Sequence, residues 1–196
     1  PEFDRKVLEV LREPLESGEI VIARARDKVR FPARFQLVAA MNPCPCGYLG
    51  DPSGRCRCSA EQIQRYRSKL SGPLLDRIDL YLHVAREATA LHANPDSGTS
   101  SAQAAATVAA ARQRQEQRQG GANAFLDLQQ LRQHCGLSDD DQHWLESACE
   151  RLGLSLRAAH RLLKVARTLA DLDAVDAIQR SHLAEALQYR PSSPTA

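Results

Sequence analysis

The pattern of apolar and polar positions divides the chain into a mixed first part and a helical second part. Residues 2–13 carry apolar side chains at helical spacing, and Pro14 is expected to kink or end that helix. Short apolar runs at residues 20–22 and 29–31 are separated by a short polar loop, which predicts a β-hairpin.

Two further apolar runs, residues 35–41 and 78–84, are short and lack helical periodicity, which favours buried parallel strands. A loop rich in Pro, Gly and Cys, residues 42–59, and a basic helix over residues 60–70 separate them. These strands are too few for a self-sufficient doubly wound sheet. We therefore expect the chain to begin inside a longer protein whose upstream part supplies the rest.

From residue 101 onward the pattern is helical. Residues 101–119 are rich in Ala, Gln and Arg, and Gly120 is expected to terminate their helix. Further helices are expected over residues 124–135 and after the capping residues Ser138, Ser155 and Ser181. Leu152 and Leu156 are placed on buried helix faces.

The predicted fold class is α/β plus all-α. The predicted boundaries are an α/β part with the cysteine-rich loop over 1–86, a linker over 87–100, a helical domain over 101–190 and a disordered tail over 191–196.

Composition and charge restrict the function only loosely. Hydrophobic residues make up 43% and charged residues 26% of the chain, which is ordinary for a globular protein. No apolar run approaches the roughly 18 residues that a membrane span needs, and no signal peptide opens the chain. We therefore expect a cytoplasmic protein without a membrane partner. The net charge of +2 neither predicts nor excludes nucleic-acid binding, although residues 1–86 are modestly basic.

Four of the six cysteines form a cluster in the sequence. Cys44 and Cys46 make one C-x-C pair, and Cys56 and Cys58 make a second pair after nine residues. Four thiolates can bind zinc tetrahedrally, although structural zinc sites more often use C-x₂-C spacing. A zinc site, free thiols, and a disulfide or redox pair all remain open. The two other cysteines, Cys135 and Cys149, are expected to be plain core residues.

Four segments of the chain carry a family resemblance. They are PEFDRKVLEVLREPLESGEI, FPARFQLVAAMNPCPCG, SGPLLDRIDL and LSLRAAHRLLKVARTLADL. In this order they resemble the magnesium-chelatase-like AAA+ ATPases, and within that group the bacterial competence-associated DNA branch-migration helicases. The resemblance covers about residues 1–190. It implies a partial AAA+ core, with the C-terminal part of a parallel sheet and an inserted β-hairpin, followed by a helical lid domain.

The resemblance also implies an ATP site that this chain completes only in part. In the family, the Walker A and Walker B motifs precede a segment like Pro1–Phe3, and this chain contains no G-x-x-x-x-G-K-[ST] sequence. The family's cofactors are ATP and Mg²⁺. The longer protein is therefore expected to be an ATPase, and the chain alone is expected to be inactive.

Three residues match ATP-site elements of the family. Asn42 matches sensor 1, which orients the attacking water or the γ-phosphate. Arg77 matches the arginine finger, which stabilises the transferred phosphoryl group on a neighbouring subunit. Arg157 matches sensor 2 in the first turn of a lid helix. Each has a simpler interpretation from sequence alone: a turn residue for Asn42, a surface ion pair for Arg77 and a solvated basic face for Arg157.

The predicted hairpin is strongly basic. Its positive residues are Arg24, Arg26, Lys28 and Arg30. Related helicases insert such hairpins into the pore of a ring, so these side chains are candidates for DNA phosphate contacts. A charged hairpin that merely stays soluble is an equal alternative.

The function implied by the resemblance is ATP hydrolysis in a homo-oligomeric ring, expected to be a hexamer, coupled to DNA remodelling or branch migration. One alternative is the ATPase motor subunit of a magnesium chelatase. Another is a non-enzymatic, zinc-stapled interaction module.

Overall fold

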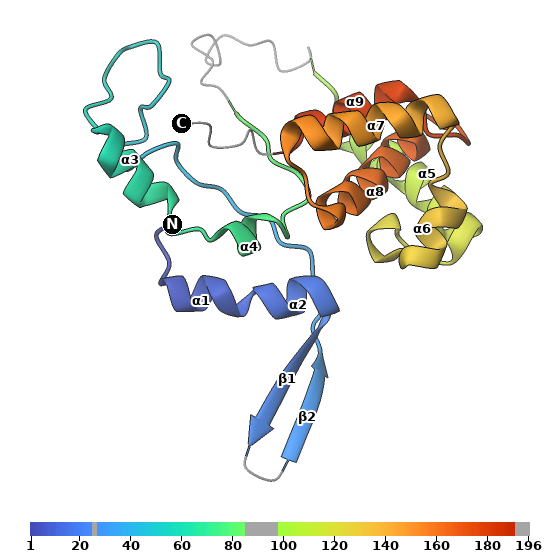
Figure 1. Ribbon diagram of the computed structural model, residues 1–196, viewed down its shortest axis with the longest axis horizontal. Coiled ribbons are helices and arrows are strands. Elements are labelled where there is room, and N and C mark those ends of the chain that lie inside the picture. The colour runs from blue at the N-terminus through green and yellow to red at the C-terminus, as the bar shows by residue number, and fades with distance from the viewer. Residues whose placement is uncertain (25–26, 85–97, 191–196) are drawn as a thin grey trace. The chain divides into compact units, whose positions relative to one another are not determined.

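The computed structural model describes residues 1–24, 27–84 and 98–190. Its contacts divide the chain into two compact units, Pro1–Ile78 and Asp79–Ala196 (Figure 1). Most of the predicted linker over 87–100 and all of the predicted tail over 191–196 lie outside the described residues.

The first unit opens with two short helices, α1 (Arg5–Val10) and α2 (Arg12–Ser17). The break between them falls at Leu11, in the turn just before Pro14, so the predicted helix is kinked there and is not ended by Pro14. Pro14 is the third residue of α2, a first-turn position where a backbone N–H has no helical partner. The helix instead ends at Gly18, whose φ of 70° suits glycine.

The predicted hairpin is confirmed. Strand β1 (Glu19–Arg24) pairs antiparallel with β2 (Asp27–Pro32) (Figure 1). Ile22 lies opposite Val29. Because side chains alternate along a strand, the larger apolar residues Ile20, Ile22, Val29 and Phe31 lie on one hairpin face. Lys28 and Arg30 lie on the other face, together with Val21 and Ala23.

The two predicted parallel strands are not formed. Residues 35–41 and 78–84 are extended without ladder hydrogen bonds, and Val38, Leu82 and Val84 are 84%, 72% and 87% exposed. A parallel strand requires a neighbouring strand for its backbone N–H and C=O groups. Within the described residues the only sheet is the two-stranded hairpin, and neither segment belongs to it.

The rest of the first unit contains two helices and a small core. Helix α3 (Ala60–Arg67) is capped by the Ser59 side chain, and α4 (Gly72–Leu75) by Ser71. The buried residues described in this unit are Pro14, Cys44, Tyr66 and Leu74. A core this small leaves much of the unit's apolar surface exposed.

The second unit is a helical bundle with its own core. Its elements are α5 (Ser101–Gln119), the 3₁₀ turn η2 (Asn123–Phe125), α6 (Leu128–His134), α7 (Asp139–Leu152), α8 (Leu156–Leu172) and α9 (Arg180–Gln188). Leu145, Leu162 and Leu183 lie in the core. In the described part of the chain, no helix combines the length and the apolar character that crossing a membrane requires.

Most helices of this unit agree with the prediction, but two helix boundaries and one buried face need correction. The helix predicted over 124–135 is divided into η2 and α6. Helix α9 begins before Ser181, because His182 Nδ1 accepts the backbone N–H of Gln179 at 3.0 Å and caps the helix there. Leu152 and Leu156 are 50% and 73% exposed, because each sits at the end of a helix, beyond the packed faces.

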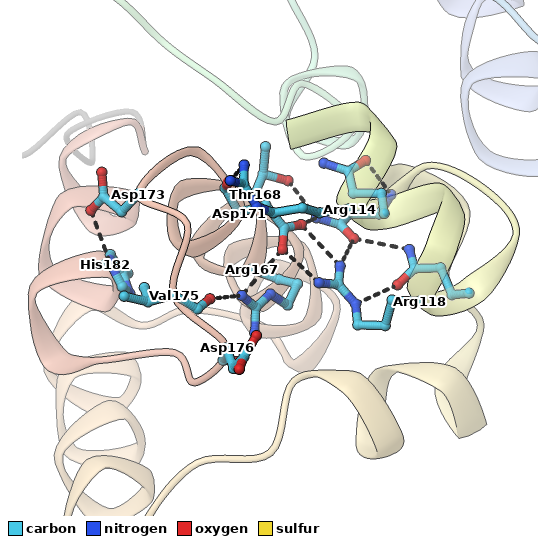
Figure 2. Close-up of polar contacts among 12 residues, drawn as sticks. Arg114, Arg118, Arg167, Thr168, Asp171, Asp173, Val175, Asp176 and His182 are labelled. Atoms are coloured by element: carbon cyan, nitrogen blue, oxygen red, sulfur yellow. Dashed lines mark hydrogen bonds and ion pairs between the residues drawn. The ribbon is translucent and has the colours of Figure 1, made fainter. Parts of the chain in front are cut away.

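A buried ionic network ties the bundle together (Figure 2). The Asp171 carboxylate of α8 accepts hydrogen bonds from Arg118 of α5 at 2.5 and 2.9 Å and from Asn123 of η2 at 2.8 Å. Arg167 Nη2 lies 3.2 Å from Asp171 Oδ1 and also donates to the backbone oxygen of Val175 at 2.7 Å. Asp171 and Arg167 are 1% and 2% exposed, so this charge pairing is almost fully removed from water.

The network determines the protonation of its carboxyl group. Burial by itself raises the pKa of Asp171, but hydrogen bonds from Arg118 and Asn123 and the charge of Arg167 outweigh it. The net effect lowers the pKa of Asp171 below its ordinary value. Asp171 is therefore ionised in the folded protein at neutral pH.

Replacing Asp171 with Asn should lower the free energy of unfolding by about 3–5 kcal/mol, because two guanidinium groups lose their buried counter-charge. Urea unfolding followed by the fluorescence of Trp144, the single tryptophan, reports this unit directly. The matched control is Glu150→Gln, which removes a carboxylate from an exposed position of α7 and should change stability by less than about 0.5 kcal/mol. Equal effects of the two variants would contradict the role of the network.

Acid should remove the same stabilisation. A carboxyl group whose pKa is lowered by folding stabilises the protein above its unfolded-state pKa, about 3.9 for Asp, and this contribution is lost as the pH falls through the folded value. The stability difference between the wild type and Asp171→Asn should therefore shrink below about pH 4. Urea titrations at a series of pH values measure it, and a difference that stays constant down to pH ~2 would contradict the assignment.

Candidate functional site

Asn42 follows the extended apolar segment and lies beside the cysteine-rich loop. Its exposed side chain is next to Gly47, where a Cβ atom would come 3.7 Å from Asn42 Cγ. Its backbone contacts the hydroxyl of Tyr66, a buried residue of α3 whose pKa is raised mainly by that burial. The loop and α3 together therefore position the candidate sensor 1 residue.

Arg77 folds back onto its own chain. Its Nη1 donates to the backbone oxygen of Pro73 at 2.5 Å, its Nη2 pairs with the carboxylate of Glu16, and its side chain is 10% exposed. The ion pair joins Arg77 to Glu16 of α2. Glu16 lies 61 residues away along the chain, and no local pattern pointed to it.

The Arg77 side chain also borders a shallow pocket of about 390 Å³. Its other lining residues come from α1 and α2: Glu9, Val10, Arg12 and Glu13. Hydrogen bonds from Ser71 and Arg12 lower the pKa of Glu9, so an ionised carboxylate faces this pocket at neutral pH. The guanidinium of Arg77 thus sits in acidic surroundings.

Arg157 lies in the first turn of α8 and is exposed. The Ser155 hydroxyl caps this helix by accepting the backbone N–H of Ala158 at 3.2 Å, as the sequence predicts. Two basic residues further along α8, Arg161 and Lys164, make contacts within the second unit.

Arg161 is 17% exposed and pairs with Asp79 at 2.6 Å. Lys164 donates to the backbone oxygen of Ala124 at 3.0 Å, and burial lowers its pKa. Both side chains are therefore used within the second unit, and Asp79 is a partner that sequence reasoning missed.

The three candidate ATP-site residues come from both units. Asn42 and Arg77 belong to Pro1–Ile78, where one contacts the cysteine-rich loop and the other contacts α2. Arg157 belongs to Asp79–Ala196.

The basic hairpin residues are described in part. Lys28 and Arg30 lie on one face of β2, opposite Ala23 and Val21. The Arg30 side chain is 74% exposed and lies 3.6 Å from Glu19. Arg26 and the side chain of Arg24 lie outside the described residues.

The four clustered cysteines converge on one point. Cys44 Sγ lies 3.4 Å from Cys46 Sγ and 3.8 Å from Cys56 Sγ, and Cys46 and Cys56 are 3.7 Å apart. All four sulfur atoms, including that of Cys58, lie within 4.8 Å of one another. The four thiols are free, so the disulfide interpretation does not apply to this structure.

The cluster contains sulfur atoms of very different acidity. Backbone hydrogen bonds from Tyr48 and Arg57 lower the pKa of Cys46 to about 6. For Cys58, a backbone contact with Cys46 favours ionisation, but the neighbouring sulfur atoms and burial outweigh it and raise the pKa to about 12. One thiolate therefore forms readily and opposes ionisation of its neighbours.

The two remaining cysteines lie in the helical unit, as predicted. Cys135 is buried in the core, and burial raises the pKa of its thiol to about 11. Cys149 is half-buried and packs against the same core. Neither belongs to the cluster.

Comparisons with known proteins match the whole described chain. The family model for magnesium chelatase subunit ChlI matches residues 1–91, and the model for the C-terminal part of that subunit matches residues 98–190. Competence protein ComM of Haemophilus influenzae and the uncharacterized protein YifB of Escherichia coli are each 52% identical over 192 residues. An uncharacterized protein of Mycobacterium bovis is 40% identical over 192 residues.

These relatives are much longer than the matched region. The alignments with ComM and YifB cover 97% of this chain but only 37% of each relative. The alignment with the Mycobacterium bovis protein covers 96% of this chain and 38% of that relative.

Proposed function

Since this chain belongs to the magnesium-chelatase-like family, we propose that it supplies part of the ATP site and the lid of an AAA+ motor that hydrolyses ATP in a homo-hexameric ring. The observation that carries the proposal is the placement of Asn42, Arg77 and Arg157. Asn42 follows an extended apolar segment, Arg77 lies in the turn after α4, and Arg157 opens a well-capped helix. The match to ComM spans 97% of the chain and includes all three positions.

In this proposal the three residues act at the γ-phosphate of ATP. Asn42 orients the attacking water, and Arg157 links the lid to the nucleotide. Arg77 reaches the nucleotide of the neighbouring subunit, where its planar guanidinium stabilises charge that develops in the transition state. ATP and Mg²⁺ are the cofactors, and they are held chiefly by phosphate-binding motifs that this chain does not contain.

The exposed apolar segments fit the same proposal. In the longer protein, residues 35–41 and 78–84 would add to a parallel sheet as strands, which would bury side chains such as Val38 and Leu82. Asn42 would then lie at the carboxyl end of a buried strand, where open α/β sheets bind their ligands.

DNA is the proposed substrate of the motor. Lys28 and Arg30 occupy one face of a projecting hairpin, and such a face can contact backbone phosphates without reading sequence. The name of one relative, competence protein, is consistent with this choice. A magnesium-chelatase motor is the second candidate, because the matching family models describe a chelatase subunit. ATPase activity of the longer protein that DNA stimulates would support the first candidate, and activity indifferent to DNA would favour the second.

The chain alone should not hydrolyse ATP, because it lacks the Walker A sequence. Phosphate release by the purified 196-residue chain should equal that of a buffer control, while the longer protein should be active. Turnover by the chain alone that Arg77→Ala abolishes would contradict the proposal.

Arg77→Ala in the longer protein should reduce kcat by roughly 10³-fold and leave nucleotide affinity nearly unchanged, because the finger engages charge formed mainly in the transition state. Mixing this variant with a Walker A variant should partly restore activity, since some interfaces then pair an intact Arg77 with an intact Walker A. Arg77→Lys is the matched variant, because it keeps the charge but loses the planar fork.

Mixed rings that recover no activity, together with weaker ATP binding by Arg77→Ala, would show that Arg77 serves its own subunit. Glu16→Gln is the control for loss of the ion pair itself. It removes the carboxylate that pairs with Arg77 but leaves the guanidinium in place. It should retain most of the activity that Arg77→Ala loses.

The double variant Lys28→Ala and Arg30→Ala should bind duplex DNA more weakly. A plot of log affinity against log salt concentration should become less steep by about 2, because each lost phosphate contact lowers the magnitude of its slope by about 0.9. Fluorescence anisotropy at several salt concentrations measures this slope. The control is Arg112→Ala with Arg132→Ala, which removes two exposed charges from the helical unit. Equal loss of affinity in both double variants would point to non-specific attraction and contradict a hairpin site.

A further inference from the structure

We infer that Cys44, Cys46, Cys56 and Cys58 bind one Zn²⁺ ion, and that this ion holds the loop of residues 43–58 in the conformation that supports Asn42. The metal site stands on the cysteine geometry alone. Its consequence for Asn42 rests on the proposed ATPase function.

The sulfur positions match a tetrahedral zinc site. A Zn–S bond of about 2.3 Å places neighbouring sulfur atoms of a regular tetrahedron about 3.8 Å apart. The separations among the sulfur atoms of Cys44, Cys46 and Cys56 are 3.4, 3.8 and 3.7 Å, close to that value. The sulfur atom of Cys58 lies within 4.8 Å of these three. A disulfide requires about 2.05 Å, so the cluster has the dimensions of a four-thiolate metal site.

The backbone around the cluster is arranged to support thiolates. Cys44 Sγ is within hydrogen-bonding reach of the backbone of Leu49, and Cys46 Sγ of the backbones of Tyr48 and Arg57. The contact with Arg57 crosses from one C-x-C pair to the other. Such contacts stabilise charged sulfur and fix the two arms relative to each other.

The loop has little else to hold it. Residues 43–59 contain no helix or strand, and Cys44, at 0% exposed, is the only residue among them that is buried. Three consecutive turns determine the path of the loop. They are closed by backbone hydrogen bonds from Gly47 to Cys44, from Asp51 to Tyr48 and from Gly54 to Asp51. A seventeen-residue segment without regular structure or a core is typically stabilised by a metal ion or a ligand.

The ion would be structural. Four protein ligands fill the tetrahedral coordination of zinc and leave no position for water or substrate. Its effect on catalysis would therefore act through position. The turn from Cys44 to Gly47 lies beside the Asn42 side chain, and loss of the ion would leave that turn free to move away. Asn42 is two residues from the first ligand.

Elemental analysis of the purified 196-residue chain should find about one zinc per chain. Cys56→Ser should lose the ion, while Cys149→Ser, which changes a cysteine outside the cluster, should keep it. Cys58→His should retain a metal, because imidazole is also a zinc ligand, and in the Co²⁺-substituted protein it should alter the visible absorption bands.

Chain purified under reducing conditions with less than about 0.2 equivalents of metal, yet with the loop fully protected from exchange, would overturn the inference. One equivalent of iron in place of zinc would overturn the identity of the ion, since four thiolates also suit iron.

Hydrogen exchange tests the consequence for Asn42. Chelator treatment should speed amide exchange over residues 42–58 by about tenfold or more and leave the peptides of α8 unchanged, because the helical unit has its own core. Equal exchange with and without metal would refute the positioning role while leaving the metal site itself intact. These readouts use no ATP, so failure of the ATPase proposal would leave them unaffected.

Discussion

The helical unit depends on one buried carboxylate. Asp171 lies in α8, and its oxygens accept hydrogen bonds from α5 and from η2 while Arg167 extends the network to the turn before α9. Buried charges are costly unless each is paired and hydrogen-bonded, so alternative packings that separate these groups are strongly disfavoured. The network therefore fixes α8 against α5, and α8 is the helix that carries Arg157. In the proposed function, this rigidity would let Arg157 report the nucleotide state from the first turn of α8.

The first unit is stabilised differently. Its described buried residues are few, and the side chain of Val38 is exposed on an extended segment that is not part of a sheet. Such surface is typical of elements that are completed by contacts outside the segment itself. The proposed zinc site and the proposed sheet both address this need. The zinc ion would cross-link a loop without a core, and the sheet would take up the extended segment. Asn42 lies between the two segments concerned, because it follows the extended segment and precedes the cysteine-rich loop.

The sequence predicted those features whose signals are local. Ser138 and Ser155 begin helices because a hydroxyl can accept a nearby backbone N–H, and that pattern is visible within four residues. The hairpin was predictable for the same reason. The strand predicted at residues 35–41 is not formed, because an apolar run shows that burial is favoured but not whether a partner strand is present. The Glu16 partner of Arg77 and the Asp79 partner of Arg161 are distant in sequence, so only the folded chain identifies them.

In the proposed function, Asn42, Arg77 and Arg157 converge on ATP only in an assembled ring. An experimental structure of the longer protein with a non-hydrolysable ATP analogue tests this most directly. Asn42 and Arg157 of one subunit and Arg77 of its neighbour should lie within hydrogen-bonding reach, about 3 Å, of the γ-phosphate or its attacking water. A γ-phosphate contacted by Arg77 of its own subunit, or by none of these three residues, would contradict it.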